Sequence, residues 1–181
     1  MSLPMTETVT DPAETAPPTA ERSYPRFAKP QRVAFVQSSW HRDVVAGCWE
    51  SFVREIVERG IVASQVDLFE VPGSFEIPLH VQMLAKTRRY TAIVAAGLVV
   101  DDGLTGFVAQ TVIQALMDVQ LKTEVPVFSA VATPHSFERG SPNTEHFRQH
   151  FATKGADVAH ACADTLLSLE RLRGQVAAGI V

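Results

Sequence analysis

The stretch Thr91–Val100 constrains the fold of this chain most, because it is apolar almost throughout. A strand with one solvated face alternates apolar and polar residues, whereas a strand covered by helices on both faces does not. The stretch is also far shorter than the roughly 20 apolar residues that a membrane-spanning helix needs. We therefore predict a central strand of a parallel sheet, covered on both faces.

Three further strand patterns alternate with helical patterns along the chain. The expected strands are 32–38, 65–71 and 125–132; the expected helices are 43–59, 75–87, one following Gly106, and 153–173, with a loop at 138–144. Helices between consecutive strands imply crossover connections, which make the strands parallel and place helices on both faces. The predicted fold class is α/β, a three-layer sandwich with a four-stranded, mainly parallel sheet.

The composition of the chain changes at Gln31. Residues 1–30 hold six of the eleven prolines and few large apolar residues. Such a composition cannot offset the entropy lost on ordering, so we predict a disordered or loosely attached tail. The remaining residues, 31–181, are enough for the core of one α/β domain.

Charge and cysteine usage exclude several classes of protein. The net charge is −4 and the 16 Lys and Arg are scattered, which argues against a nucleic-acid partner. The N-terminus lacks the layout of a secretory signal, so we expect a cytoplasmic protein with no membrane partner. Cys48 and Cys162 lack CxxC spacing and are interpreted as small core residues. The histidines form no metal-binding pattern, and no metal or cofactor is expected.

Residues 71–78, Val-Pro-Gly-Ser-Phe-Glu-Ile-Pro, lead from the second expected strand into a helix. Ser74 is expected to cap that helix, with Glu76 in its first turn. The carboxyl ends of parallel strands are where open α/β folds bind ligands. Glu76 therefore either faces a ligand or merely complements the helix dipole.

Other candidate residues lie at the same edge of the expected sheet. Trp40 and His41 follow the first strand; Trp40 either offers a flat face for stacking on a heteroaromatic ring or packs at the rim of the core. Gly103 and Gly106 precede a helix and suit an anion such as phosphate. His135 ends the fourth strand.

Taken together and in this order, these stretches resemble lumazine synthase. The matching segments are 36–41, 71–79, 107–110, 125–129, 133–135 and 154–155. Trp40 makes the chain most similar to the tryptophan-containing, type II-like variant of that family. The resemblance implies a flavodoxin-like sandwich that condenses 5-amino-6-(ribitylamino)uracil with 3,4-dihydroxy-2-butanone 4-phosphate, without metal or organic cofactor. It also implies pentamers, often paired into decamers, with the site shared between neighbouring subunits.

The resemblance also implies roles for individual residues. Trp40 would stack on the pyrimidine, and Ser74, Phe75 and Glu76 would meet the ribityl chain and the ring edge. The remaining implied contacts are the strand backbone at Leu98, Val99 and Val100 for the heterocycle, Ser129 for the pocket wall, and Gly103, Leu104 and Thr105 for the phosphate.

One segment departs from the family pattern. Members of the family carry a longer loop with a basic residue just before the helix, whereas residues 102–107 read Asp-Gly-Leu-Thr-Gly-Phe, with Gly106 the nearest counterpart. A general acid or base contributes about 10²- to 10⁴-fold in rate, but positioning two reactants supplies about 7 to 11 kcal/mol. We therefore predict a slow but real synthase, with His41 and His135 as candidate replacements for the missing base.

Two other functions fit the same residues. One is a non-catalytic paralogue that keeps the aromatic slot and binds a lumazine or a flavin. The other is a structural shell or scaffold subunit, which would assemble but would neither bind nor catalyse.

Overall fold

The computed structural model describes residues 26–100, 105–133 and 143–181. Four strands form one sheet: β1 (Val33–Ser38), β2 (Val66–Val71), β3 (Ala92–Leu98) and β4 (Val127–Ala132). Their order is β2-β1-β3-β4, and every neighbouring pair is parallel. The predicted parallel sheet with a buried third strand is confirmed. The order reverses between β1 and β3, which creates a topological switch point at their carboxyl ends.

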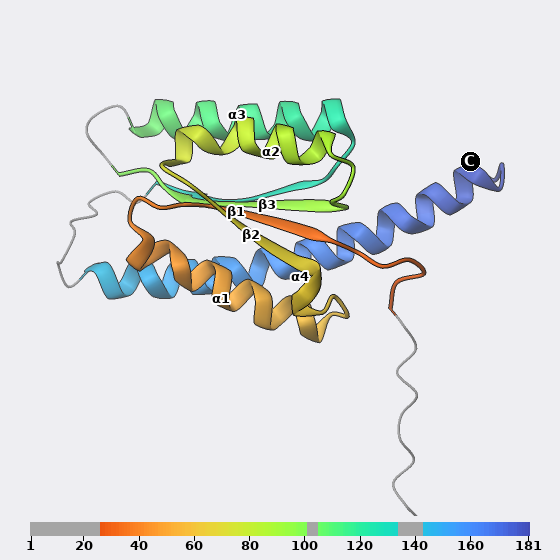
Figure 1. The fold of residues 1–181 in the computed structure, drawn as a ribbon, viewed down its shortest axis with the longest axis horizontal. Coiled ribbons are helices and arrows are strands. Elements are labelled where there is room, and N and C mark those ends of the chain that lie inside the picture. Colours follow the sequence, from red (N-terminus) through yellow and green to blue (C-terminus); the bar gives the residue numbers. More distant parts are fainter. Residues whose placement is uncertain (1–25, 101–104, 134–142) are drawn as a thin grey trace, which may run out of the picture.

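Two pairs of helices cover the sheet and complete the three layers (Figure 1). One face carries α1 (Arg42–Glu58) and α4 (Asn143–Ala177), and the other carries α2 (Ile77–Lys86) and α3 (Thr105–Thr123). The sheet has a hydrophobic core on each face. Alternate residues of β1 contribute to the two cores, since successive side chains of a strand point to opposite faces. Phe35 packs in the core between the sheet and helices α1 and α4, whereas Val36 packs in the core between the sheet and helices α2 and α3.

The last helix is much longer than the expected 153–173. It begins at Asn143, so the predicted loop is wrong for residues 143–144, and residues 134–142 lie outside the described part. Its polar first turns are explained by contacts with the start of α1: Arg148 Nε donates to the Asp43 carbonyl at 2.7 Å. Gly155 lies inside this helix where it crosses α1, and a Cβ there would overlap the Cys48 carbonyl oxygen.

The folded part also begins upstream of residue 31. Phe27 is 8% exposed and packs in the core beneath α1 and α4. The backbone N–H groups of Ala28 and Lys29 donate to the Glu170 carboxylate at 3.2 and 3.1 Å. Residues 27–29 therefore contact the folded domain, while residues 1–25 lie outside the described ranges.

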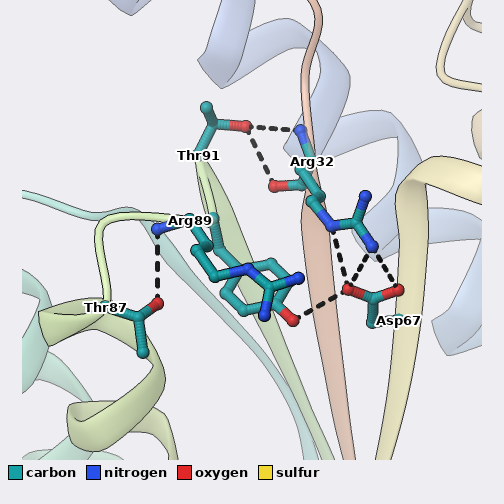
Figure 2. A network of polar contacts seen from close by, with 6 residues as sticks. Arg32, Asp67, Thr87, Arg89 and Thr91 are labelled. Atoms are coloured by element: carbon teal, nitrogen blue, oxygen red, sulfur yellow. Dashed lines mark hydrogen bonds and ion pairs between the residues drawn. The ribbon is translucent and has the colours of Figure 1, made fainter.

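A polar network joins the first three strands at their amino ends (Figure 2). Arg32 donates to both carboxylate oxygens of Asp67 at 2.9 and 2.8 Å, and Tyr90 Oη donates to Asp67 at 2.8 Å. Burial opposes the charged form of Asp67, but these hydrogen bonds outweigh it and hold the pKa of Asp67 below its ordinary value. The amino edge of the sheet is thus fixed by structural contacts, which leaves the opposite edge for ligands.

Candidate functional site

A cavity of about 220 Å³ opens at the switch point, at the carboxyl ends of β1 and β3. Its walls come from the loop after β1, the turn after β2, the end of β3 and the start of α3. The lining residues are Trp40, His41, Ser74, Phe75, Leu98, Val99, Val100 and Val108. Sequence reasoning placed all of these except Val108 at a ligand site, and the structure brings them together.

The loop that carries Trp40 is held by the end of β2. Ser39 N–H donates to the Val71 carbonyl at 2.7 Å, and Trp40 N–H donates to the Pro72 carbonyl at 3.0 Å. His41 then turns the chain into α1 with φ 57° and ψ 35°, a left-handed conformation that is uncommon outside glycine. This strand-like pairing continues beyond β1 and fixes the backbone position of Trp40.

A three-residue bridge supports the same loop from the α1 side of the sheet. Gln37 Nε2 donates to Glu70 Oε1 at 3.0 Å, and the Arg42 guanidinium lies 3.0 Å from the same oxygen. Gln37 is in β1, Glu70 is in β2 and Arg42 starts α1. The bridge therefore links both ends of the Trp40 loop to the neighbouring strand.

The indole of Trp40 lies directly against Gly73. A Cβ built on Gly73 would be 2.6 Å from Trp40 Cε3 and 3.0 Å from Glu76 Oε2. Gly73 has an extended backbone, φ −136°, so the space between these side chains, and not the conformation, explains the glycine. The side chain of Trp40 nevertheless remains 63% exposed, so one face is open to a ligand.

Glu76 closes the turn after β2. Its Oε2 accepts a hydrogen bond from Gly73 N–H at 2.9 Å, which is the capping-box contact. The residue lies beside the cavity but is not one of its lining residues. In the structure its carboxylate thus stabilises the turn, as the helix-terminus interpretation of the sequence expected.

Ser74 does not cap a helix, contrary to the sequence prediction. It begins a short 3₁₀ turn, η2 (Ser74–Glu76), and α2 starts after it, with Pro78 in its first turn as expected. Ser74 is 6% exposed, and its Oγ has no hydrogen-bond partner among the described residues. A buried hydroxyl without a partner is costly, so a polar group of a ligand would satisfy it.

Ser74 can lie this deep because Gly97 of β3 has no side chain and leaves room for it. A Cβ on Gly97 would overlap Ser74 Oγ and would lie 3.2 Å from Ile77 Cδ1. Neither Gly73 nor Gly97 was singled out from the sequence as a contact residue. The signal was present, because Gly97 interrupts a run of larger apolar residues in the central strand.

The remaining predicted site residues do not join this cavity. Ser129 is exposed in the middle of the edge strand β4 and is absent from the lining. Thr105 and Gly106 form the first residues of α3, with no atom within 4 Å of a Cβ built on Gly106. Gly103, Leu104 and His135 lie outside the described residues.

Other hollows are larger but lie away from the switch point. One of about 820 Å³ lies between the carboxyl end of α3, the start of β4 and the last turns of α4, and its walls include Leu121, Leu172 and Val176. It is at the amino edge of the sheet, where α/β folds do not place their ligands. Within the described ranges, no three His, Cys, Asp or Glu side chains gather in a way that could hold a metal ion.

The fold and the cavity define a doubly wound α/β protein with a cavity at its topological switch point. A family model described as 6,7-dimethyl-8-ribityllumazine synthase matches residues 30–170, and the chain belongs to that family. The resemblance stated from the sequence is thereby confirmed.

Several curated relatives cover most of the chain. The 6,7-dimethyl-8-ribityllumazine synthase 2 of Bradyrhizobium diazoefficiens is 67% identical over 166 residues, which are 91% of this chain and 98% of the relative. The protein of the same name from Pseudomonas syringae pv. tomato is 50% identical, over 86% of this chain and 93% of its own length. The 6,7-dimethyl-8-ribityllumazine synthase of Rhodococcus erythropolis is 54% identical, over 78% and 93% respectively.

Proposed function

We propose that the protein condenses 5-amino-6-(ribitylamino)uracil with 3,4-dihydroxy-2-butanone 4-phosphate to 6,7-dimethyl-8-ribityllumazine, in riboflavin biosynthesis. The observation that carries this proposal is the pairing of open aromatic walls with a buried hydroxyl. Trp40 and Phe75 are 63% and 65% exposed beside the unpaired Ser74 Oγ. A heteroaromatic ring bearing a polyhydroxy chain matches both, and the family membership supports the assignment.

The proposed roles follow the walls of the cavity. Trp40 stacks on the pyrimidine, and Ser74, Phe75 and Glu76 contact the ribityl chain and the ring edge. The backbone at Leu98, Val99 and Val100 hydrogen-bonds the heterocycle edge. Gly103, Leu104 and Thr105 bind the phosphate in this proposal, as the family resemblance implies, and Ser129 contributes from the edge strand. Holding two reactants together is the main catalytic effect in this proposal.

A two-substrate assay tests the proposed reaction. Formation of the lumazine, followed by its absorbance or fluorescence, should exceed the uncatalysed rate in proportion to protein concentration. We expect slow turnover, because residues 101–107 contain no basic side chain. A rate equal to that of the same mixture without protein would contradict the proposal.

A second candidate function is binding of a lumazine or flavin without turnover. The segment 101–107, which has no basic residue, favours it, because the open indole of Trp40 can hold a ring whether or not a proton is transferred. Titration with riboflavin, observed through quenching of tryptophan fluorescence, would show tight association in both cases. Binding without turnover would identify a binding protein. The absence of both binding and turnover would indicate a scaffold subunit.

We also propose self-association into pentamers or decamers, in a cytoplasmic protein. Large apolar side chains are exposed on the layer formed by α2 and α3, including Leu79, Met83, Phe107 and Leu121. Exposed apolar surface of this kind is typical of subunit interfaces. Light scattering coupled to size exclusion gives the copy number directly. No helix in the described part of the chain could cross a membrane.

A further inference from the structure

His41 is the one side chain with a titratable group near neutral pH among the described residues that line the cavity. The others are aromatic or aliphatic, apart from the hydroxyl of Ser74. Imidazole is the side chain best suited to transfer protons near neutral pH. A condensation that makes and breaks N–H and O–H bonds needs such a proton carrier.

His41 turns the chain from the loop after β1 into α1. It is the residue before α1, its carbonyl accepts from Val44 and Val45 at 2.9 and 3.0 Å, and its side chain makes no capping hydrogen bond to the helix. Its backbone has φ 57°, which glycine or asparagine adopts more easily. Strained residues of this kind gather at functional sites, where the strain aims a side chain.

Charged groups of the neighbouring segments make contacts that hold the loop and the turn. Arg42 pairs with Glu70, which also accepts from Gln37, and the Glu76 carboxylate accepts from Gly73 N–H. These contacts fix the loop on both sides of His41 and hold the turn opposite it. His41 therefore lines the cavity on a supported backbone, next in sequence to Trp40, on which the substrate ring would stack.

We propose that the His41 imidazole carries protons in the condensation, in place of a basic residue before α3; this inference rests on the proposed function. The amine nitrogen of the pyrimidine attacks the ketone carbon, an N–C bond forms, and the carbonyl electron pair moves to oxygen. His41 takes one proton from that nitrogen and delivers it to the oxygen, which gives a neutral carbinolamine. It then takes the second proton from that nitrogen and gives it to the departing hydroxyl as the C–O bond breaks and the C=N bond forms, so the imidazole ends the step neutral, as it began. The products of this step are an imine and water.

Two substitutions separate proton transfer from shape. His41→Asn keeps a polar side chain that tolerates the left-handed backbone, and His41→Gly relieves the strain and leaves room for free imidazole. His160→Asn is the matched control, because His160 lies in α4 and contacts Glu55 away from the cavity. For each protein we would measure turnover with both substrates, riboflavin affinity, and the recovery of turnover with added imidazole.

The role predicts a specific pattern of results. Both His41 variants should lose about 10²- to 10⁴-fold in turnover, bind riboflavin as wild type does, and only His41→Gly should regain activity with imidazole. His160→Asn should match wild type. Wild-type turnover that persists in both His41 variants would refute the role of His41 alone. If the wild-type protein turned over no faster than the uncatalysed reaction, the proposed reaction would be refuted, and with it the role of His41.

Discussion

Replacing Gly73 by alanine should displace the indole of Trp40 without unfolding the protein. The new methyl group would lie 2.6 Å from Trp40 Cε3 and 2.7 Å from Cζ3, whereas carbon atoms in contact are separated by about 3.5 to 4.0 Å. The ring must therefore retreat by roughly 1 Å. An extended backbone at φ −136° accepts alanine, and the indole is already largely exposed, so it can swing outward at little cost to the core.

The effect on binding follows from the loss of stacking. Stacking a heterocycle on an aromatic side chain contributes about 1 to 3 kcal/mol, so Gly73→Ala should weaken riboflavin binding by about 5- to 150-fold. Fluorescence titration measures this, and a urea melt checks the fold. Gly174→Ala is the control, because no atom lies within 4 Å of a Cβ built there. Wild-type affinity in a folded Gly73→Ala protein would show that the indole does not hold the ligand.

Three further predictions concern packing and ionisation. Gly97→Ala should lower the free energy of unfolding by about 1 to 3 kcal/mol, because its methyl group overlaps Ser74 Oγ; Ser74→Gly in the same chain should recover part of the loss in a urea melt. Asp67→Asn should cost about 1 to 2 kcal/mol at pH 7. Because the pKa of folded Asp67 is lowered, its contribution is present above the ordinary carboxyl pKa and vanishes as pH falls through the folded value. The difference in unfolding free energy between wild type and Asp67→Asn should therefore be smaller at pH 3 than at pH 7, and an equal difference at both would contradict the assignment. Burial raises the pKa values of Cys48 and Cys162 to about 12, so neither thiol should react with a disulfide reagent at pH 8 until urea unfolds the protein.

The layers of the fold could be predicted because each strand and helix carries a local pattern. The uninterrupted apolar run at Ala92–Leu98 identifies a strand buried on both faces, and all four strands pair in parallel. The start of α4 was harder to predict, because its first turns are mostly polar. Phe147 and Phe151, four residues apart, face the α1 side and were the available helical signal. Phe27 was missed because its partners in the core lie far away in the sequence.

The site could be predicted at the level of segments but not of contacts. Trp40, His41, Ser74 and Phe75 meet because parallel strands end at one edge, a consequence of topology that the sequence pattern contains. The approach of Trp40 to Gly73 depends on how two loops register against each other, which no local pattern encodes. For the same reason the sequence misassigned Ser74 as a cap, since strand-to-helix turns with a serine admit more than one geometry.

The anchoring of the chain near its start by Glu170 decides where attached groups can go. Ala28 and Lys29 are tied to α4, so the incoming segment and the projecting end of that helix leave the domain on the same side (Figure 1). The mouth beside Trp40 is at the far side. A fluorescent label or an affinity matrix joined at the carboxyl end of α4 would therefore leave the approach to the indole clear, which makes immobilised protein suitable for ligand screening.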